Sequence, residues 1–189
     1  GAAMTYEARR KTRATFNNPG EAHELTFTCF QFRKFLSKDR TRQYAIDSIQ
    51  RAREKYKFDL WAYVIMPEHM HLLIYPTDEL YDISKILTGI KLSVSKKAIN
   101  YLRRNNPRGL SQLATGHQCA PYAFWMDGGG YDRNVIKKET LEFMVNYIHN
   151  NPVRRGLVER PEQWTWSSFR EWQEPGTGAF RLDLESLPF

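Results

Sequence analysis

The sequence contains few cysteines and no long hydrophobic run. Its two cysteines, Cys29 and Cys119, lie far apart and form no Cys-x-x-Cys pair, which argues against a disulfide scaffold or a thiolate zinc site and suits a reducing cytoplasm. No stretch approaches the roughly 18 apolar residues that a membrane span requires, and no signal-peptide pattern is present. We therefore expect a cytoplasmic protein with no membrane partner.

Acidic residues are missing from one long segment of a chain that is basic as a whole. Lysine and arginine number 28 against 21 aspartates and glutamates, which gives a net charge of +7. No acidic residue occurs between Lys85 and Arg108, whereas a solvated helix face usually carries both signs. Such a stretch is typical of a track for the phosphates of a nucleic acid.

Internal repeats and interdomain linkers are also absent, so the length of 189 residues predicts one domain with short extensions. Residues 1–20 are polar and basic and are interpreted as an N-terminal arm, whose first three residues resemble a cloning remnant. Residues 21–172 hold the periodic segments and form the predicted folded domain. Residues 173–189 are expected to be a C-terminal tail.

Hydrophobic periodicity predicts alternating strands and helices. Their order matches the ferredoxin-like split βαβ topology, an α+β fold with one antiparallel sheet and helices packed on one side. In this topology the first and third strands are usually central neighbours. The predicted strands are 23–32, 58–65, 69–75 and a glycine-interrupted strand within 124–136, and the predicted helices are 39–56, 82–104 and 138–150, the last ending before Pro152.

Two histidines, His69 and His71, flank a single apolar residue in the third predicted strand. Alternate residues of a strand point the same way, roughly 6–7 Å apart, so both imidazoles leave one face of the sheet. Two neutral imidazoles on a rigid strand can bind one divalent ion if a third ligand comes from elsewhere. The alternative is a pair of ordinary strand histidines without a ligand.

The last predicted helix carries candidates for the missing groups. Tyr147 and Asn151 are four residues apart and share one helix face. If this face lies over the histidines, Asn151 would offer a carbonyl oxygen to a metal and Tyr147 its phenol. Because Asn151 precedes a proline, an earlier helix end is also compatible with the sequence, and Asn150 or His149 would then take its place. A tyrosine on an apolar stripe is equally compatible with a place at the edge of the core.

Three sequence blocks resemble those of single-tyrosine HUH transposases. Met66-Pro-Glu-His-Met-His71, followed by Leu-Leu-Ile, resembles their His-hydrophobe-His motif, in particular that of the group associated with repetitive extragenic palindromes (REP). The segment Tyr147–Val158, followed by Trp164–Ser168, is similar to the tyrosine helix of that group. Phe124-Trp125 with Gly128–Arg133 is similar to its penultimate block. The match spans about residues 22 to 172, which makes 21–172 the expected catalytic domain.

The resemblance implies a metal-dependent, single-stranded DNA endonuclease and strand transferase. It implies that His69 and His71 bind Mg²⁺ or Mn²⁺, with Asn151 as the most plausible third ligand, and that Tyr147 is the nucleophile of a 5′-phosphotyrosine intermediate. The implied substrate is single-stranded DNA with a hairpin (palindromic) element, bound by a monomer or a homodimer.

This chemistry also requires a proton acceptor and residues that bind DNA. A free phenol has a pKa near 10, so a proton acceptor would help, and Glu68 and His149 are candidates, although Glu68 is equally suited to a turn. Basic residues in the arm, along residues 85–108 and beside Tyr147 are expected to contact the DNA backbone. The basic candidates are Arg9, Arg10, Lys85, Lys91, Lys96, Arg103, Arg154 and Arg155.

The sequence is also compatible with three other functions. A single-stranded nucleic-acid-binding protein of the same fold, without catalysis, would expose aromatic residues on its first and third strands. A metal hydrolase for small molecules would use more histidines and carboxylates than this chain offers. A domesticated nuclease without transposition would share all the residues discussed above.

Overall fold

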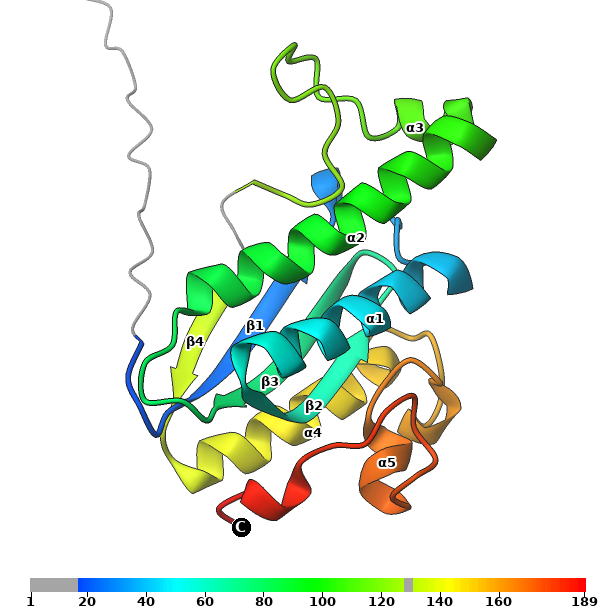
Figure 1. Ribbon diagram of the computed structural model, residues 1–189. Helices are drawn as coiled ribbons and strands as arrows, with labels where there is room; N and C mark the ends of the chain where they lie inside the picture. The colour runs from blue at the N-terminus through cyan, green and yellow to red at the C-terminus, as the bar shows by residue number, and fades with distance from the viewer. Residues whose placement is uncertain (1–16, 128–130) are drawn as a thin grey trace, which may run out of the picture.

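The computed structural model describes residues 17–127 and 131–189. The arm residues Arg9 and Arg10 and the predicted glycine turn at 128–130 lie outside the described residues. The predicted order of strands and helices is confirmed (Figure 1). The elements are β1 (Ala22–Thr28), α1 (Asp39–Tyr56), β2 (Phe58–Ile65), β3 (His69–Pro76), α2 (Ile83–Asn105), α3 (Pro107–Ser111), β4 (Tyr131–Val135), α4 (Lys138–Arg154) and α5 (Phe169–Gln173), with short 3-10 turns at Phe30–Phe32, Pro161–Gln163 and Leu184–Ser186.

The four strands form one antiparallel sheet in the order β2-β3-β1-β4. The predicted central position of the first and third strands is therefore confirmed. Along their shared ladder His71 lies opposite Thr26, and His69 lies opposite Thr28. The predicted α+β class with an antiparallel sheet is also confirmed, and the two histidines are in the middle of the sheet.

Helices α1 and α2 cover one face of this sheet. Apolar residues recur along α2 at steps of three and four, and Asp82 caps the helix by accepting a hydrogen bond from the Ser84 amide at 2.9 Å. The buried side chains of both helices form one core with the even-numbered residues of β3, such as Met70 and Leu72. This face is therefore closed to solvent.

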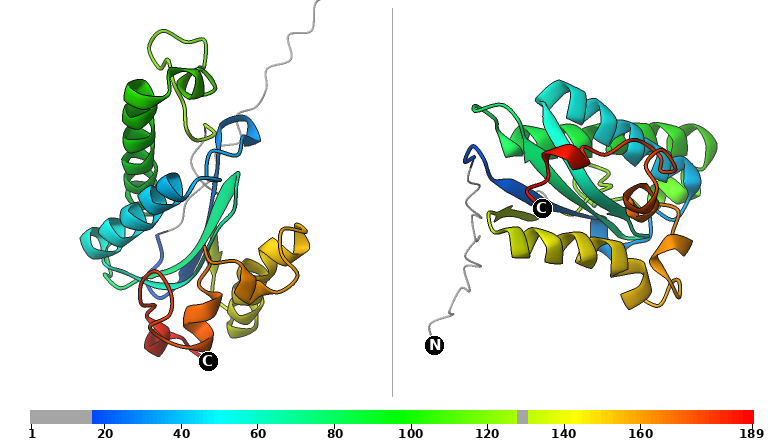
Figure 2. Two further views of the ribbon diagram at one scale, coloured as in Figure 1. Left: turned by 90° about the vertical axis from the view of Figure 1, so that its right-hand side faces the viewer. Right: turned by 90° about the horizontal axis from the view of Figure 1, so that it is seen from below.

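Helix α4 covers the opposite face, so the expectation that all helices pack on one side is corrected (Figure 2). Its buried residues, including Met144 and Ile148, form a second core with Val64 and Leu73. The physical reason lies in β2, whose residues are apolar on both faces and almost all buried. An uncovered face would leave these side chains in water. The odd-numbered residues of β3, His69 and His71 among them, consequently point toward α4.

Helix α4 also continues through Pro152 to Arg154, whereas the sequence predicts an end at residue 150. A proline in a helix loses one backbone hydrogen bond and strains the preceding turn. Here only the last turn is affected, and both Asn151 and Pro152 are buried, which fixes them against the domain. Asn151 consequently keeps its place one helical turn beyond Tyr147.

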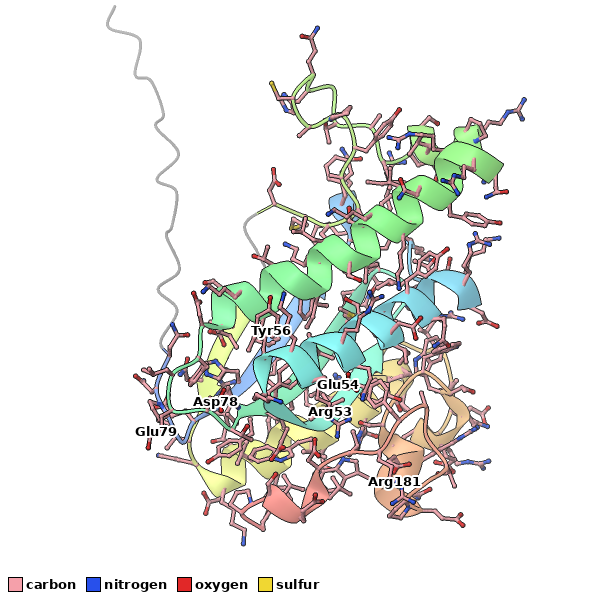
Figure 3. The ribbon with its side chains drawn as sticks, viewed as in Figure 1. Arg53, Glu54, Tyr56, Asp78, Glu79 and Arg181 are labelled. Atoms are coloured by element: carbon pink, nitrogen blue, oxygen red, sulfur yellow. The ribbon has the colours of Figure 1, made fainter. Side chains whose placement is uncertain are left out.

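Residues 173–189 pack against the domain, and the expectation of a C-terminal tail is wrong. Asp183 accepts hydrogen bonds from the backbone amide of Leu60 at 2.9 Å and from the Arg53 guanidinium at 2.6 Å. Arg53 also donates to the carbonyl of Arg181 at 2.7 Å (Figure 3). Because β2 is an edge strand, these contacts cover backbone groups that would otherwise be open to another chain.

Replacing Asp183 with alanine is expected to lower the free energy of unfolding by about 1–3 kcal/mol, because the buried Leu60 amide loses its side-chain acceptor. Urea denaturation followed by circular dichroism measures this. Asp47→Ala is the matched control, since this exposed carboxylate accepts a hydrogen bond from Gln43 on the same helix and should change stability by less than about 0.5 kcal/mol. Equal stabilities of the two variants would show that the Asp183 contacts contribute nothing to the fold.

Within residues 17–127 and 131–189, no helix is both long and apolar enough to cross a membrane.

Candidate active site

His69 and His71 project from the same face of β3, as strand alternation predicts. Their ring centroids are 4.8 Å apart and the ring planes are nearly perpendicular, at 86°. The two side chains are only 12% and 10% exposed, respectively. The histidines therefore form a close, largely buried pair beneath α4.

A carboxylate fixes the Nδ1 atom of each ring. Nδ1 of His69 lies 2.9 Å from a carboxylate oxygen of Glu68, and Nδ1 of His71 lies 2.8 Å from one of Glu24. The Thr26 hydroxyl donates to the same Glu24 oxygen at 3.0 Å. An ionised carboxylate only accepts hydrogen bonds, so each Nδ1 carries a proton, and Nε2 of the neutral ring then keeps its lone pair. Both rings thus present the atom that binds a metal, in the carboxylate–histidine arrangement of metal sites.

Burial keeps the His69 imidazole neutral. Desolvation, followed by the nearby His71, lowers the pKa of His69 to about 4 from an ordinary value near 6.5. At neutral pH this ring therefore carries no charge. The neutral imidazole is the form that ligates metals.

Helix α4 places the two predicted partners over this pair in the same chain. The Tyr147 ring centroid lies 6.0 Å from that of His71. The amide nitrogen of Asn151 lies 3.5 Å from Nε2 of His69. Asn151 is 4% exposed, whereas Tyr147 is 39% exposed and is not a core residue. One turn of α4 thus brings a buried amide and an accessible phenol to the histidines.

Two further side chains flank the phenol. The Arg154 guanidinium lies 3.8 Å from the centre of the Tyr147 ring and donates to the Tyr147 carbonyl at 3.0 Å. Phe143 stacks beside the ring at 6.2 Å between centroids and is 61% exposed. Phe143 and Tyr147 are therefore not part of the buried apolar face of this helix. They form an open aromatic surface next to the histidines.

Of the two candidate proton acceptors, only Glu68 lies at the site. Its carboxylate oxygen accepts from His69 and, at 2.7 Å, from Arg155. The side chain of Glu68 is 12% exposed and that of Arg155 is 55% exposed. Glu68 thus orients His69 and links it to a cation that faces solvent.

His149 points elsewhere, although it is only two residues from Tyr147. Its Nε2 lies 2.7 Å from the Ser168 hydroxyl, and its ring packs edge-on against Phe169 and Trp172. Burial lowers the pKa of His149 to about 4. The structure does not bring this imidazole to the phenol, and its contacts are those of a packed core residue.

The basic candidates divide into two groups. Arg154 and Arg155 adjoin the histidines, as described above. Lys85, Lys91, Lys96 and Arg103 lie on α2, which covers the other face of the sheet. The Lys91 ammonium is 3.4 Å from the Met126 carbonyl, and burial lowers its pKa.

Sequence reasoning missed Glu24, which is 5% exposed. The signal was present, because Glu24 and Thr26 alternate with apolar residues in β1 and therefore share a face. Combined with the expected pairing of the first and third strands, this alternation places a carboxylate beside His71. The distance in sequence, 47 residues, hides the contact.

The residues present fit a divalent ion with open coordination positions. Within the described part of the chain, no group of three or more His, Cys, Asp or Glu side chains could hold a metal. The protein ligands would be the two Nε2 atoms of His69 and His71, with the Asn151 amide as the third. Both imidazoles are oriented by carboxylates, and the remaining positions would suit water or phosphate oxygens.

The fold and this cluster together define a transposase-like protein of the kind that the sequence blocks indicate. Comparison with known proteins gives the family. The chain belongs to the family described as "Transposase IS200 like", which residues 23–151 match.

Two relatives agree with this assignment. A Haemophilus influenzae protein named "Putative REP-associated tyrosine transposase" is 27% identical over 147 residues, which cover 73% of this chain and 78% of that protein. A solved structure of a REP-associated tyrosine transposase bound to a REP hairpin superposes with a TM-score of 0.65. The two sequences are 19% identical, and the superposition covers 86% of this chain and 85% of the neighbour. This likeness supports the fold of the chain. The predicted resemblance to this group is confirmed.

The alternative of a non-catalytic binding sheet meets a structural difficulty. It requires exposed aromatic rings on β1 and β3, whereas Phe27 of β1 is fully buried and helices cover both faces of the sheet. The face that would stack bases instead carries His69 and His71.

Proposed function

We propose that this protein is a metal-dependent, single-stranded DNA endonuclease and strand transferase that uses Tyr147 as its nucleophile. The observation that carries the proposal is the 6.0 Å approach of the Tyr147 and His71 rings within one chain. Carboxylates hold Nδ1 of both histidines, which leaves Nε2 as the ligating atom of each ring, as expected for metal ligands.

The proposed reaction joins the Tyr147 oxygen to the phosphorus of a phosphodiester. The phenol oxygen forms a bond to phosphorus while the bond from phosphorus to the 3′ oxygen breaks. The released 3′ oxygen takes a proton from water, which leaves a 5′-phosphotyrosine and a free 3′-hydroxyl. Attack by a 3′-hydroxyl on this linkage reverses the step and transfers the strand. Because Tyr147 is 39% exposed, its proton can pass to water, with Glu68 as the candidate acceptor among the side chains.

His69, His71 and Asn151 would hold Mg²⁺ or Mn²⁺. When bound, such an ion polarises the scissile phosphate and orients it. Asn151 would present its carbonyl oxygen after its amide turns by 180°, since the nitrogen faces His69 in the structure described above. The role of Glu24 and Glu68 is to keep both rings in the ligating tautomer.

The proposed substrate is single-stranded DNA next to a hairpin. The proposal is supported by the resemblance of the sequence blocks, and a structural neighbour of this chain was solved bound to a REP hairpin. Arg154 and Arg155 lie where the phosphates would pass, and the exposed Phe143 ring would stack a base beside the nucleophile. All these groups come from one chain, so we propose that a monomer is sufficient. We also propose that the protein acts in the cytoplasm, whether it moves an element or serves the host.

Replacing Glu24 with alanine is expected to raise the Mn²⁺ concentration for half-maximal cleavage by about 10- to 100-fold, on the order observed for loss of a partner that orients a metal-bound histidine. The reason is that His71 loses the acceptor that fixes its tautomer. A Mn²⁺ titration of cleavage measures the shift, and saturating Mn²⁺ should restore most of the rate.

Glu54→Ala is the matched control, because this exposed α1 carboxylate accepts a hydrogen bond from Gln50 on the same helix. Circular dichroism shows that each variant is folded. A Glu24→Ala protein that folds and has the Mn²⁺ dependence of the unaltered chain would contradict the role assigned to this carboxylate.

A further inference from the structure

A second site lies on the face of the sheet opposite the histidines. We propose that the cavity between α1 and α2 binds one unpaired base of a single-stranded DNA substrate, with the neighbouring phosphates on its basic rim. The inference rests on the proposed function, since it assigns a second contact to the same strand.

The cavity has a volume of about 270 Å³ and lies between the N-terminal end of α1 and the C-terminal end of α2, which are adjacent in the fold (Figure 1). Pockets for drug-sized ligands begin at about 300 Å³, so this one suits a single nucleotide. Four aromatic side chains line it: Phe35, Tyr44, Tyr101 and Phe124. Three are partly exposed, while Phe124 is 2% exposed and forms the floor against Phe35.

The charged side chains that line the cavity are all positive. Lys34, Lys38 and Arg40 line the cavity, and none of the described lining residues is acidic. The Arg40 guanidinium lies 3.4 Å from the centre of the Tyr101 ring, and the Lys97 ammonium lies 5.8 Å from that of Tyr44. A planar guanidinium thus already occupies one of these aromatic faces, as a base would. Rings for the base and cations for the phosphates are the combination that binds single strands without reading sequence.

The cavity is joined directly to the turn that leads to the histidines. Leu36 lies between the lining residues Phe35 and Ser37. Its backbone amide donates to the Pro67 carbonyl at 2.9 Å, and its carbonyl accepts from Arg42 at 3.0 Å. Pro67 precedes Glu68, the residue that orients His69. The cavity and the histidine pair consequently lie at the same end of the sheet, on its two faces. A single DNA strand that passes from the α4 side of the sheet around this end would reach the cavity.

A surface that binds only DNA phosphates would not account for the aromatic lining of the cavity. Cations on an exposed helix suffice for backbone binding and need no concave aromatic lining. Two polar residues, Gln112 and Asn106, also line the cavity and add hydrogen-bonding groups. The combination favours a nucleotide with its base inserted.

The test compares binding of two dodecamers in EDTA, so that no strand is cut. One is a pool of random single-stranded sequences, and the other carries abasic sites throughout, with the same phosphates. Fluorescence anisotropy should show that the unaltered chain prefers the pool. Tyr101→Ala should weaken binding to the pool by about tenfold and leave the abasic strand unchanged, whereas Tyr101→Phe keeps the ring and the preference.

Arg40→Ala should weaken binding to both strands, while Arg51→Ala, which removes an exposed cation farther along α1, should not. The inference is overturned if Tyr101→Ala binds the pool as the unaltered chain does, or if it loses the same affinity for both strands. Adduct formation in Mn²⁺ is measured separately on each protein. A chain that forms adducts but shows no Tyr101 effect refutes the second site alone, and a chain that forms none refutes the proposed chemistry.

Discussion

Tyr147→Phe abolishes covalent attachment of the protein to hairpin-bearing single-stranded DNA in Mn²⁺: this is the largest effect that we expect. The substitution removes only the attacking oxygen, and nucleophile removal in comparable enzymes costs at least about 10³-fold. The ring contacts with His71 and Arg154 do not involve that oxygen, so fold and DNA binding should survive. A denaturing gel of reactions with hairpins that carry randomised unpaired flanks measures the adduct.

Tyr75→Phe is the matched control for this experiment. Tyr75 lies on the same strand as the histidines but stacks on Trp61, with 4.9 Å between ring centroids, away from the site. This variant should form adducts at the rate of the unaltered chain. A shifted band that the Tyr147→Phe protein still gives under denaturing conditions would assign the nucleophile to another residue.

His71→Gln is expected to have the second largest effect, a loss of Mn²⁺-dependent adduct formation of more than about 100-fold. Loss of an outer partner costs about 10- to 100-fold in metal sites, so loss of the ligand itself should cost at least as much. Glutamine can still donate to Glu24, which limits the structural damage. Binding of DNA in EDTA, measured by anisotropy, should change little.

His117→Gln provides the comparison, because it removes an exposed loop imidazole. We expect it to behave as the unaltered chain at every Mn²⁺ concentration. Should His71→Gln retain both the rate and the metal dependence of that control, the histidine pair would not be a metal site.

Much of the fold could be predicted from local sequence patterns. Strand alternation placed His69 and His71 on one face, and the i, i+4 spacing placed Tyr147 and Asn151 on one side of α4, because both relations depend on regular backbone geometry alone. The position of α4 is not local. It depends on β2 being apolar on both faces, which requires a helix on each side of the sheet.

Contacts between distant segments account for the other differences. Proline rules predict that α4 ends before Pro152, yet burial of Asn151 and Pro152 keeps the last turn helical. The segment after residue 172 is polar enough to suggest a tail, yet Asp183 binds the edge of β2. Glu24 became visible as a partner of His71 only once β1 and β3 were paired.

The central claim is that Tyr147 becomes joined to DNA beside a metal-binding histidine pair. The most direct measurement is mass spectrometry of the adduct formed in Mn²⁺, after digestion with protease and nuclease. We predict that the remaining nucleotide is attached through its 5′-phosphate to the peptide that contains Tyr147, and that EDTA prevents its formation. A nucleotide on any other residue, or the same adduct in EDTA, would contradict the account.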